Sequence, residues 1–152
     1  AVIIDRAADE PTIAEVEGAL AAVEAFDQPQ EGGMLGRMWM ESLVKAPEVA
    51  KLVAHPLVLE TGKALLGPLC KRIALKELSV FEVKPGKGKQ SFHREDQFWP
   101  WHHTPHAWSL NMIWAIDEFT EANGATRITP FSPTGKLRES GREMVETAYD
   151  SR

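Results

Sequence analysis

The sequence predicts an α+β fold, with helices in the N-terminal half and strands in the half that follows. Apolar residues recur at helical spacing between Ile13 and Val23, whereas apolar and polar residues alternate in the strand pattern between Ile73 and Val83. Helices and strands do not alternate along the chain, so the pattern differs from that of a parallel sheet built from βαβ units. We expect a single domain, because the chain has 152 residues.

Three helices are predicted before the strands begin. The first starts at a capping box in residues 12–15, Thr-Ile-Ala-Glu, whose outer side chains can bond to free backbone N–H groups. A loop is expected at residues 27–36, which are rich in Gly, Gln and Pro. Pro47 suits the first turn of a second helix, and the His55-Pro56 pair separates it from a third helix at residues 57–66.

Strands are expected at residues 73–83, 90–95 and 108–116. In the last of these, one face is large and apolar, and the other is smaller, partly polar and contains Asn111. Such a strand suits a sheet that packs on one side and lines a cavity on the other. A turn at Asn123-Gly124 is expected to precede a short strand at residues 125–129.

The tail, residues 131–152, is polar, with a helix predicted at residues 135–149. A sheet made of the preceding strands alone would have an exposed edge, which folded proteins avoid. We therefore expect an incomplete domain, with helices in residues 1–67, jelly-roll strands in residues 70–130 and the tail after them.

Composition narrows the classes of function. The chain is 43% hydrophobic and 26% charged with a net charge of -5, typical of a globular protein and without the basic face that nucleic acid requires. No apolar run approaches the ~20 residues of a membrane span. Cys70 is the single cysteine, which favours a reducing compartment, and we expect a cytoplasmic protein. The sequence leaves the oligomeric state open.

His93 and Glu95 are the candidate metal ligands. Residues i and i+2 of a strand point to the same side, so an imidazole nitrogen and a carboxylate oxygen can reach one metal ion. One His and one carboxylate, with a second His from elsewhere, form the facial triad of non-haem iron(II) oxygenases. Asp96 is the alternative carboxylate, which a bulge would bring to that side. The triplet by itself also fits a solvated surface strand.

Two segments resemble the phytanoyl-CoA dioxygenase family, especially its fungal natural-product branch. Residues 90–97, Gln-Ser-Phe-His-Arg-Glu-Asp-Gln, are similar to the family's metal-binding segment Gln-Pro-Leu-His-Arg-Asp-Asp. Residues 123–127, Asn-Gly-Ala-Thr-Arg, are similar to a second segment of the family. The two segments occur in the family's order and at a similar separation along the chain. The resemblance implies a double-stranded β-helix core, the cupin-like jelly roll, preceded by helices.

The resemblance also implies an iron(II)/2-oxoglutarate-dependent dioxygenase that uses molecular oxygen to hydroxylate a small, fairly apolar molecule. It assigns iron binding to His93 and Glu95. The family usually has Asp at the second of these positions, and a carboxylate there argues for oxygenation rather than halogenation. It assigns 2-oxoglutarate to Gln90 and Thr126. Asn111 is a further candidate for 2-oxoglutarate because it lies on the polar strand face.

The family's second iron-binding His and the Arg that follows it have no counterpart in this sequence. The other histidines are His55, His102, His103 and His106. Three interpretations stay open: a fragment of a dioxygenase, a non-catalytic jelly-roll binding protein with a degenerate metal site, or another kind of cupin that binds metal through the loop at residues 102–106. That loop could instead face an apolar substrate, together with Trp99 and Trp101.

Overall fold

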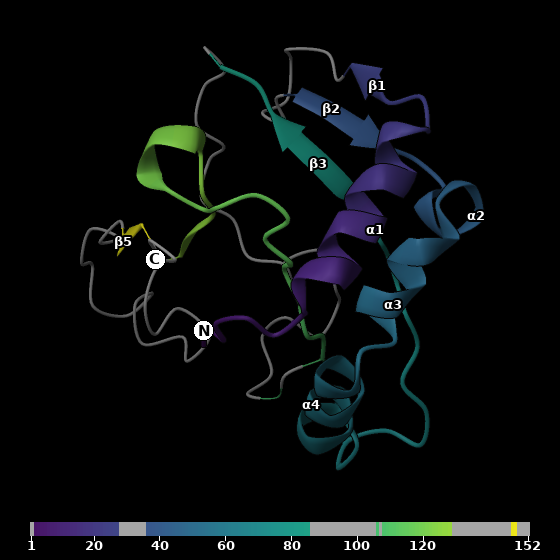
Figure 1. Cartoon of the computed structure of the whole chain (residues 1–152). Helices are drawn as coiled ribbons and strands as arrows, with labels where there is room; N and C mark the ends of the chain where they lie inside the picture. The colour runs from purple at the N-terminus through teal and green to yellow at the C-terminus, as the bar shows by residue number, and fades with distance from the viewer. Residues whose placement is uncertain (1, 28–35, 86–105, 107, 129–146, 149–152) are drawn as a thin grey trace. The chain divides into compact units, whose positions relative to one another are not determined.

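The computed structural model describes residues 2–27, 36–85, 106, 108–128 and 147–148, which form an α+β structure with small antiparallel sheets (Figure 1). The chain divides into two compact units, residues 6–116 and residues 1–5 with 117–152, and each is described by itself. None of the helices in the described ranges is long and apolar enough to cross a membrane.

Helix α1 (Glu10–Ala21) begins earlier than predicted. Asp9 is its N-cap, and the Asp9 carboxylate accepts a hydrogen bond from the Thr12 backbone N–H at 2.9 Å. Thr12 therefore lies inside the helix, and the predicted capping box at residues 12–15 is wrong. The reason is that Asp caps as well as Thr, and Pro11 in the first turn needs no N–H partner. The helical spacing is confirmed, since Val16 and Leu20 are buried.

A three-stranded antiparallel sheet, in the order β1-β2-β3, follows α1 in the first unit (Figure 1). Its strands are β1 (Phe26–Asp27), β2 (Gly36–Trp39) and β3 (Val80–Val83). Residues 27 and 36, predicted as loop, lie in strands, so the helical region at residues 1–67 also contains β1 and β2. Strands of two and four residues are too short to give a periodic signal.

Glycine is required at position 36 by the close approach of β2 and β3. Gly36 pairs with Val83 in the antiparallel register. A Cβ atom added to Gly36 would lie 1.5 Å from the backbone oxygen of Glu82. Backbone atoms cannot rotate away as a side chain can, so any larger residue would push the two strands apart.

Four short helical elements connect β2 to the rest of the unit. They are α2 (Ser42–Lys45), which was not predicted, then η1 (Pro47–Val49), α3 (Ala50–Val53) and α4 (Pro56–Leu66). Pro47 opens η1, and α4 ends before the Gly-Pro pair, as predicted. His55 is the N-cap of α4: its Nδ1 atom accepts a hydrogen bond from the Leu57 backbone N–H at 3.3 Å.

The core of this unit lies where α1 meets η1 and α3. The buried apolar residues are Val16, Leu20, Ala46, Val49 and Leu52, and the larger side chains packed against them include Trp39, Leu78, Val80, Trp114 and Ile116. The core therefore joins residues from the helices, from the sheet and from the extended segment 108–116.

The strand predicted at residues 108–116 is wrong, but the predicted alternation of its two faces is confirmed over residues 110–116. No strand is assigned to the described residues of this segment, and of residues 73–83 only β3 is a strand. Burial nevertheless alternates: Trp114 and Ile116 pack on the core, whereas Asn111 and Ile113 are exposed. Alternation in sequence shows which side of an extended chain is buried, but it does not provide a neighbouring strand.

The second unit contains η2 (Glu121–Asn123) and a two-stranded antiparallel sheet of β4 (Arg127–Ile128) and β5 (Thr147–Ala148). The predicted turn at Asn123-Gly124 is confirmed, and β4 lies within the strand predicted at residues 125–129. The helix predicted at residues 135–149 is wrong at β5, where the polar tail offers no apolar stripe to hold a helix; the rest of that prediction lies outside the described residues.

Candidate functional site

The candidate iron ligands lie outside the part of the chain that the structure describes. Gln90, His93, Glu95 and the alternative ligand Asp96 all fall within residues 86–105. Most of the His- and Trp-rich loop also falls there. The metal site and the Gln90 contact to 2-oxoglutarate therefore stay predictions. The structure describes Asn111, Thr126 and the segments that lead to the site.

Asn111 is exposed, between Leu110 and Met112, which are partly buried. Its position agrees with the predicted polar face of segment 108–116. The opposite face is held in place by Trp114, whose ring meets the His55 imidazole edge-on at a centroid distance of 5.3 Å. Asn111 thus presents an amide to solvent from a segment whose other side is packed.

Thr126 is exposed and immediately precedes β4, just after a tightly bonded turn. The Thr120 hydroxyl accepts the Asn123 backbone N–H at 3.3 Å, and the Asn123 side-chain oxygen accepts the Thr120 backbone N–H at 2.9 Å. The Asn123 amide also donates to the Glu118 carbonyl at 2.5 Å. Gly124 adopts a φ of 88°, which favours glycine.

The Asn-Gly-Ala-Thr segment therefore separates into two kinds of residue. Asn123 and Gly124 shape the turn, and Ala125 is buried. Thr126 is exposed, so its hydroxyl is accessible to a ligand. Asn111 belongs to the unit of residues 6–116 and Thr126 to the unit that includes residues 117–152, so each is placed within its own unit.

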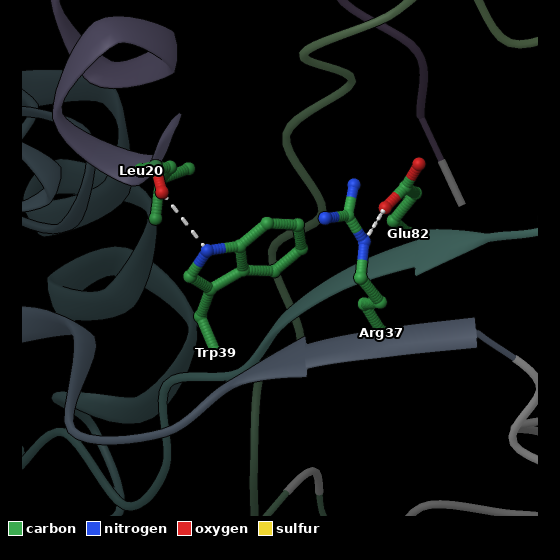
Figure 2. Close-up of polar contacts among 4 residues, drawn as sticks. All are labelled: Leu20, Arg37, Trp39 and Glu82. Carbon is green, nitrogen blue, oxygen red and sulfur yellow. Dashed lines mark hydrogen bonds and ion pairs between the residues drawn. The ribbon is translucent and has the colours of Figure 1, made fainter. Parts of the chain in front are cut away.

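Strand β3 ends ten residues before His93. It is fixed by a cluster of Arg37, Trp39 and Glu82, which the sequence did not indicate (Figure 2). The Arg37 Nε atom lies 2.5 Å from a Glu82 carboxylate oxygen. These two residues face each other directly in the β2–β3 register. Only a knowledge of the strand register could have revealed this ion pair, because 45 residues separate its partners.

Trp39 joins this cluster to helix α1 (Figure 2). Its indole Nε1 donates a hydrogen bond to the Leu20 carbonyl at 3.0 Å, and the Arg37 guanidinium lies 5.5 Å from the centre of its ring. The contact holds the C-terminal turn of α1 against β2. The chain that continues from β3 toward the predicted metal segment therefore leaves from an anchored strand.

The two histidines that the structure describes, His55 and His106, each contact an aromatic ring. The ring of His106 meets Trp108 edge-on at a centroid distance of 6.0 Å, and the His55 imidazole caps α4. Among the residues that the structure describes, no group of three His, Cys, Asp or Glu side chains could hold a metal ion. Metal binding by the loop at residues 102–106 stays a prediction, since His102 and His103 lie outside the described ranges.

Comparisons with known proteins agree with the resemblance seen in the sequence. A family model described as phytanoyl-CoA dioxygenase (PhyH) matches residues 3–152. Multifunctional dioxygenase ausE of Penicillium brasilianum is 34% identical over 83 aligned residues, which cover 45% of this chain and 27% of the relative. Dioxygenase aneA of Aspergillus aculeatus is 31% identical over 87 aligned residues, which cover 54% of this chain and 29% of the relative.

The chain thus spans less than a third of the length of these curated relatives, at 27% and 29%. Multifunctional dioxygenase ausE of Emericella nidulans is 40% identical over a shorter alignment of 57 residues, which covers 35% of this chain and 19% of the relative. No solved structure matches the chain significantly.

Proposed function

This chain belongs to the phytanoyl-CoA dioxygenase family, and from that membership we propose that it acts as an iron(II)/2-oxoglutarate-dependent dioxygenase that hydroxylates a small, fairly apolar molecule. The observation that carries the proposal is the match of the dioxygenase family over residues 3–152, which include the His93-Arg94-Glu95 triplet. We further propose that the described strands belong to a double-stranded β-helix, and that the protein works in the cytoplasm.

In this proposal His93 and Glu95 hold iron(II), because a neutral imidazole and a carboxylate are the donors that this metal takes in facial-triad sites. When bound, the iron supplies the oxidative chemistry with molecular oxygen and 2-oxoglutarate. Gln90, Thr126 and Asn111 bind 2-oxoglutarate. The exposed Thr126 hydroxyl and Asn111 amide support this role, since both groups can donate a hydrogen bond to a carboxylate.

Anaerobic titration of the complete, folded protein with iron(II) and 2-oxoglutarate tests the proposal. We expect the visible metal-to-ligand charge-transfer band in the wild type and its loss in His93→Ala and Glu95→Ala. Asp96→Ala is the matched control for the carboxylate and should keep the band. Loss in Asp96→Ala with retention in Glu95→Ala would exchange the two assignments.

His106→Ala separates the competing metal site from the proposed one. If the loop at residues 102–106 held the metal, His106→Ala would lose metal and His93→Ala would retain it. A wild-type protein that binds 2-oxoglutarate without iron, and gives no band, would defeat the dioxygenase and favour the non-catalytic jelly-roll protein.

A further inference from the structure

A hollow of about 180 Å³ lies where the chain leaves α4. The residues around it include Leu66, Leu69, Arg72, Ile73, Ala74 and Trp108. Three of the apolar side chains remain open to solvent, with exposed fractions of 39% for Leu69, 44% for Ile73 and 38% for Trp108. Apolar side chains of the hollow are therefore accessible from outside.

The same stretch of chain carries a local excess of positive charge. Residues 63–76 contain four basic residues and no acidic one, flanked by Glu60 and Glu77, in a chain whose net charge is -5. Lys63, Lys71, Arg72 and Lys76 are all exposed. A positive region attracts an anionic partner and repels the same positive region of a second copy.

We propose that this surface, named the α4-end surface and defined by Leu69, Lys71, Arg72, Ile73 and Trp108, binds an anionic lipid surface. Leucine, isoleucine and tryptophan side chains enter the boundary between headgroups and acyl chains, and basic side chains contact the phosphates. This attachment is peripheral and needs no spanning helix.

The size of the hollow supports a lipid over a free small molecule. Pockets that enclose a drug-sized ligand have volumes of about 300–1,000 Å³. The hollow of about 180 Å³ is smaller, and it suits part of an acyl chain whose remainder stays in the bilayer. Arg72 lies in the wall of the hollow, where its guanidinium can pair with the phosphate of the same lipid.

Vesicle co-sedimentation of the protein tests this proposal. We expect binding to vesicles of phosphatidylcholine mixed with phosphatidylserine, weaker binding to phosphatidylcholine alone, and release as salt is raised. Each basic residue near an anionic surface contributes about 1 kcal/mol, or about fivefold in the partition coefficient. Reversing Arg72 and removing an apolar contact in the double variant Arg72→Glu/Ile73→Asp should lower binding by more than about tenfold.

The double variant Val44→Asp/Lys45→Glu is the matched control, because it makes the same change in charge at another exposed site, where Val44 is 82% exposed. It should bind as the wild type does. Circular dichroism reports whether each variant is folded. If the double variant is unfolded, the single variant Arg72→Gln takes its place in the test, with an expected loss of about fivefold in vesicle binding.

Three outcomes would overturn the proposal. One is an equal loss in the matched control, which would mean that net charge alone governs binding. Another is no vesicle binding, or equal binding to both kinds of vesicle. The third is that sedimentation velocity shows a dimer and that Arg72→Glu/Ile73→Asp dissociates it, which would mean that the α4-end surface binds a second copy of the chain.

Discussion

The Gly36→Ala substitution tests the packing of the sheet that leads to the predicted metal segment. The added Cβ atom would lie 1.5 Å from the Glu82 carbonyl oxygen and 2.7 Å from its carbon, so β2 and β3 must separate. Overpacking of this kind costs about 1–3 kcal/mol. A weakened ladder hydrogen bond adds about 1 kcal/mol, so we expect a loss of about 2–4 kcal/mol in the free energy of unfolding.

Gly18→Ala is the matched control, because the same methyl group is added where nothing lies within 4 Å. Gly18 is exposed in the middle of α1, where alanine stabilises a helix by about 0.5–1 kcal/mol relative to glycine. The two substitutions should therefore have opposite signs. Thermal and urea unfolding, followed by circular dichroism, measure both.

For a chain of this size 1 kcal/mol corresponds to about 2–4 °C in Tm, so Gly36→Ala should lower the Tm by about 5–15 °C and Gly18→Ala should raise it slightly. If the free energy of unfolding of Gly36→Ala lay within about 0.5 kcal/mol of the wild-type value, the close contact between β2 and β3 at Gly36 would be refuted.

Three further predictions concern a hydrogen bond, a helix cap and a turn. Trp39→Phe keeps an aromatic ring but loses the bond to the Leu20 carbonyl, so unfolding should become easier by about 1 kcal/mol in urea titration. Hydrogen bonds from Thr12, first from its hydroxyl and then from its backbone N–H, lower the pKa of Asp9 below its ordinary value of 3.8. The stabilisation by Asp9 is therefore present above that value and is lost as the pH falls through the lowered pKa. Asp9→Asn keeps the cap but does not titrate, so the free energy of unfolding should differ less between about pH 7 and about pH 3 than it does in the wild type. Gly124→Ala should destabilise the turn by about 1–2 kcal/mol because its φ of 88° disfavours a Cβ atom, and in the complete protein it should weaken 2-oxoglutarate binding, measured by calorimetry, if Thr126 binds that molecule.

Those parts of the fold that rest on long periodic patterns could be predicted from the sequence. The spacing of Val16 and Leu20 fixed the buried side of α1, and Pro56 with the later Gly-Pro pair bounded α4. The sequence placed Asn111 on the partly polar face of its segment, and this residue is exposed, although no strand pairing followed. In each case the signal was local to a few turns or residues.

Features that depend on distant partners could not be predicted. Strands β1 and β2 are too short for a period, and the pairing of Arg37 with Glu82 depends on the register between strands. For the site, the sequence supplied the candidate residues and the family, while the structure separated the turn-forming Asn123 and Gly124 from the exposed Thr126. His93 and Glu95 rest on sequence alone.

The cap that His55 provides to α4 also fixes the tautomer of its ring. Because Nδ1 accepts the Leu57 N–H, its lone pair is already used and the proton of the neutral imidazole sits on Nε2. A metal ligand needs a free lone pair, so coordination through Nε2 would first require the proton to move to Nδ1, whereas coordination through Nδ1 would take its lone pair away from the Leu57 N–H. Either way α4 would lose its cap. The third iron ligand of the proposed dioxygenase is therefore to be sought in a histidine other than His55.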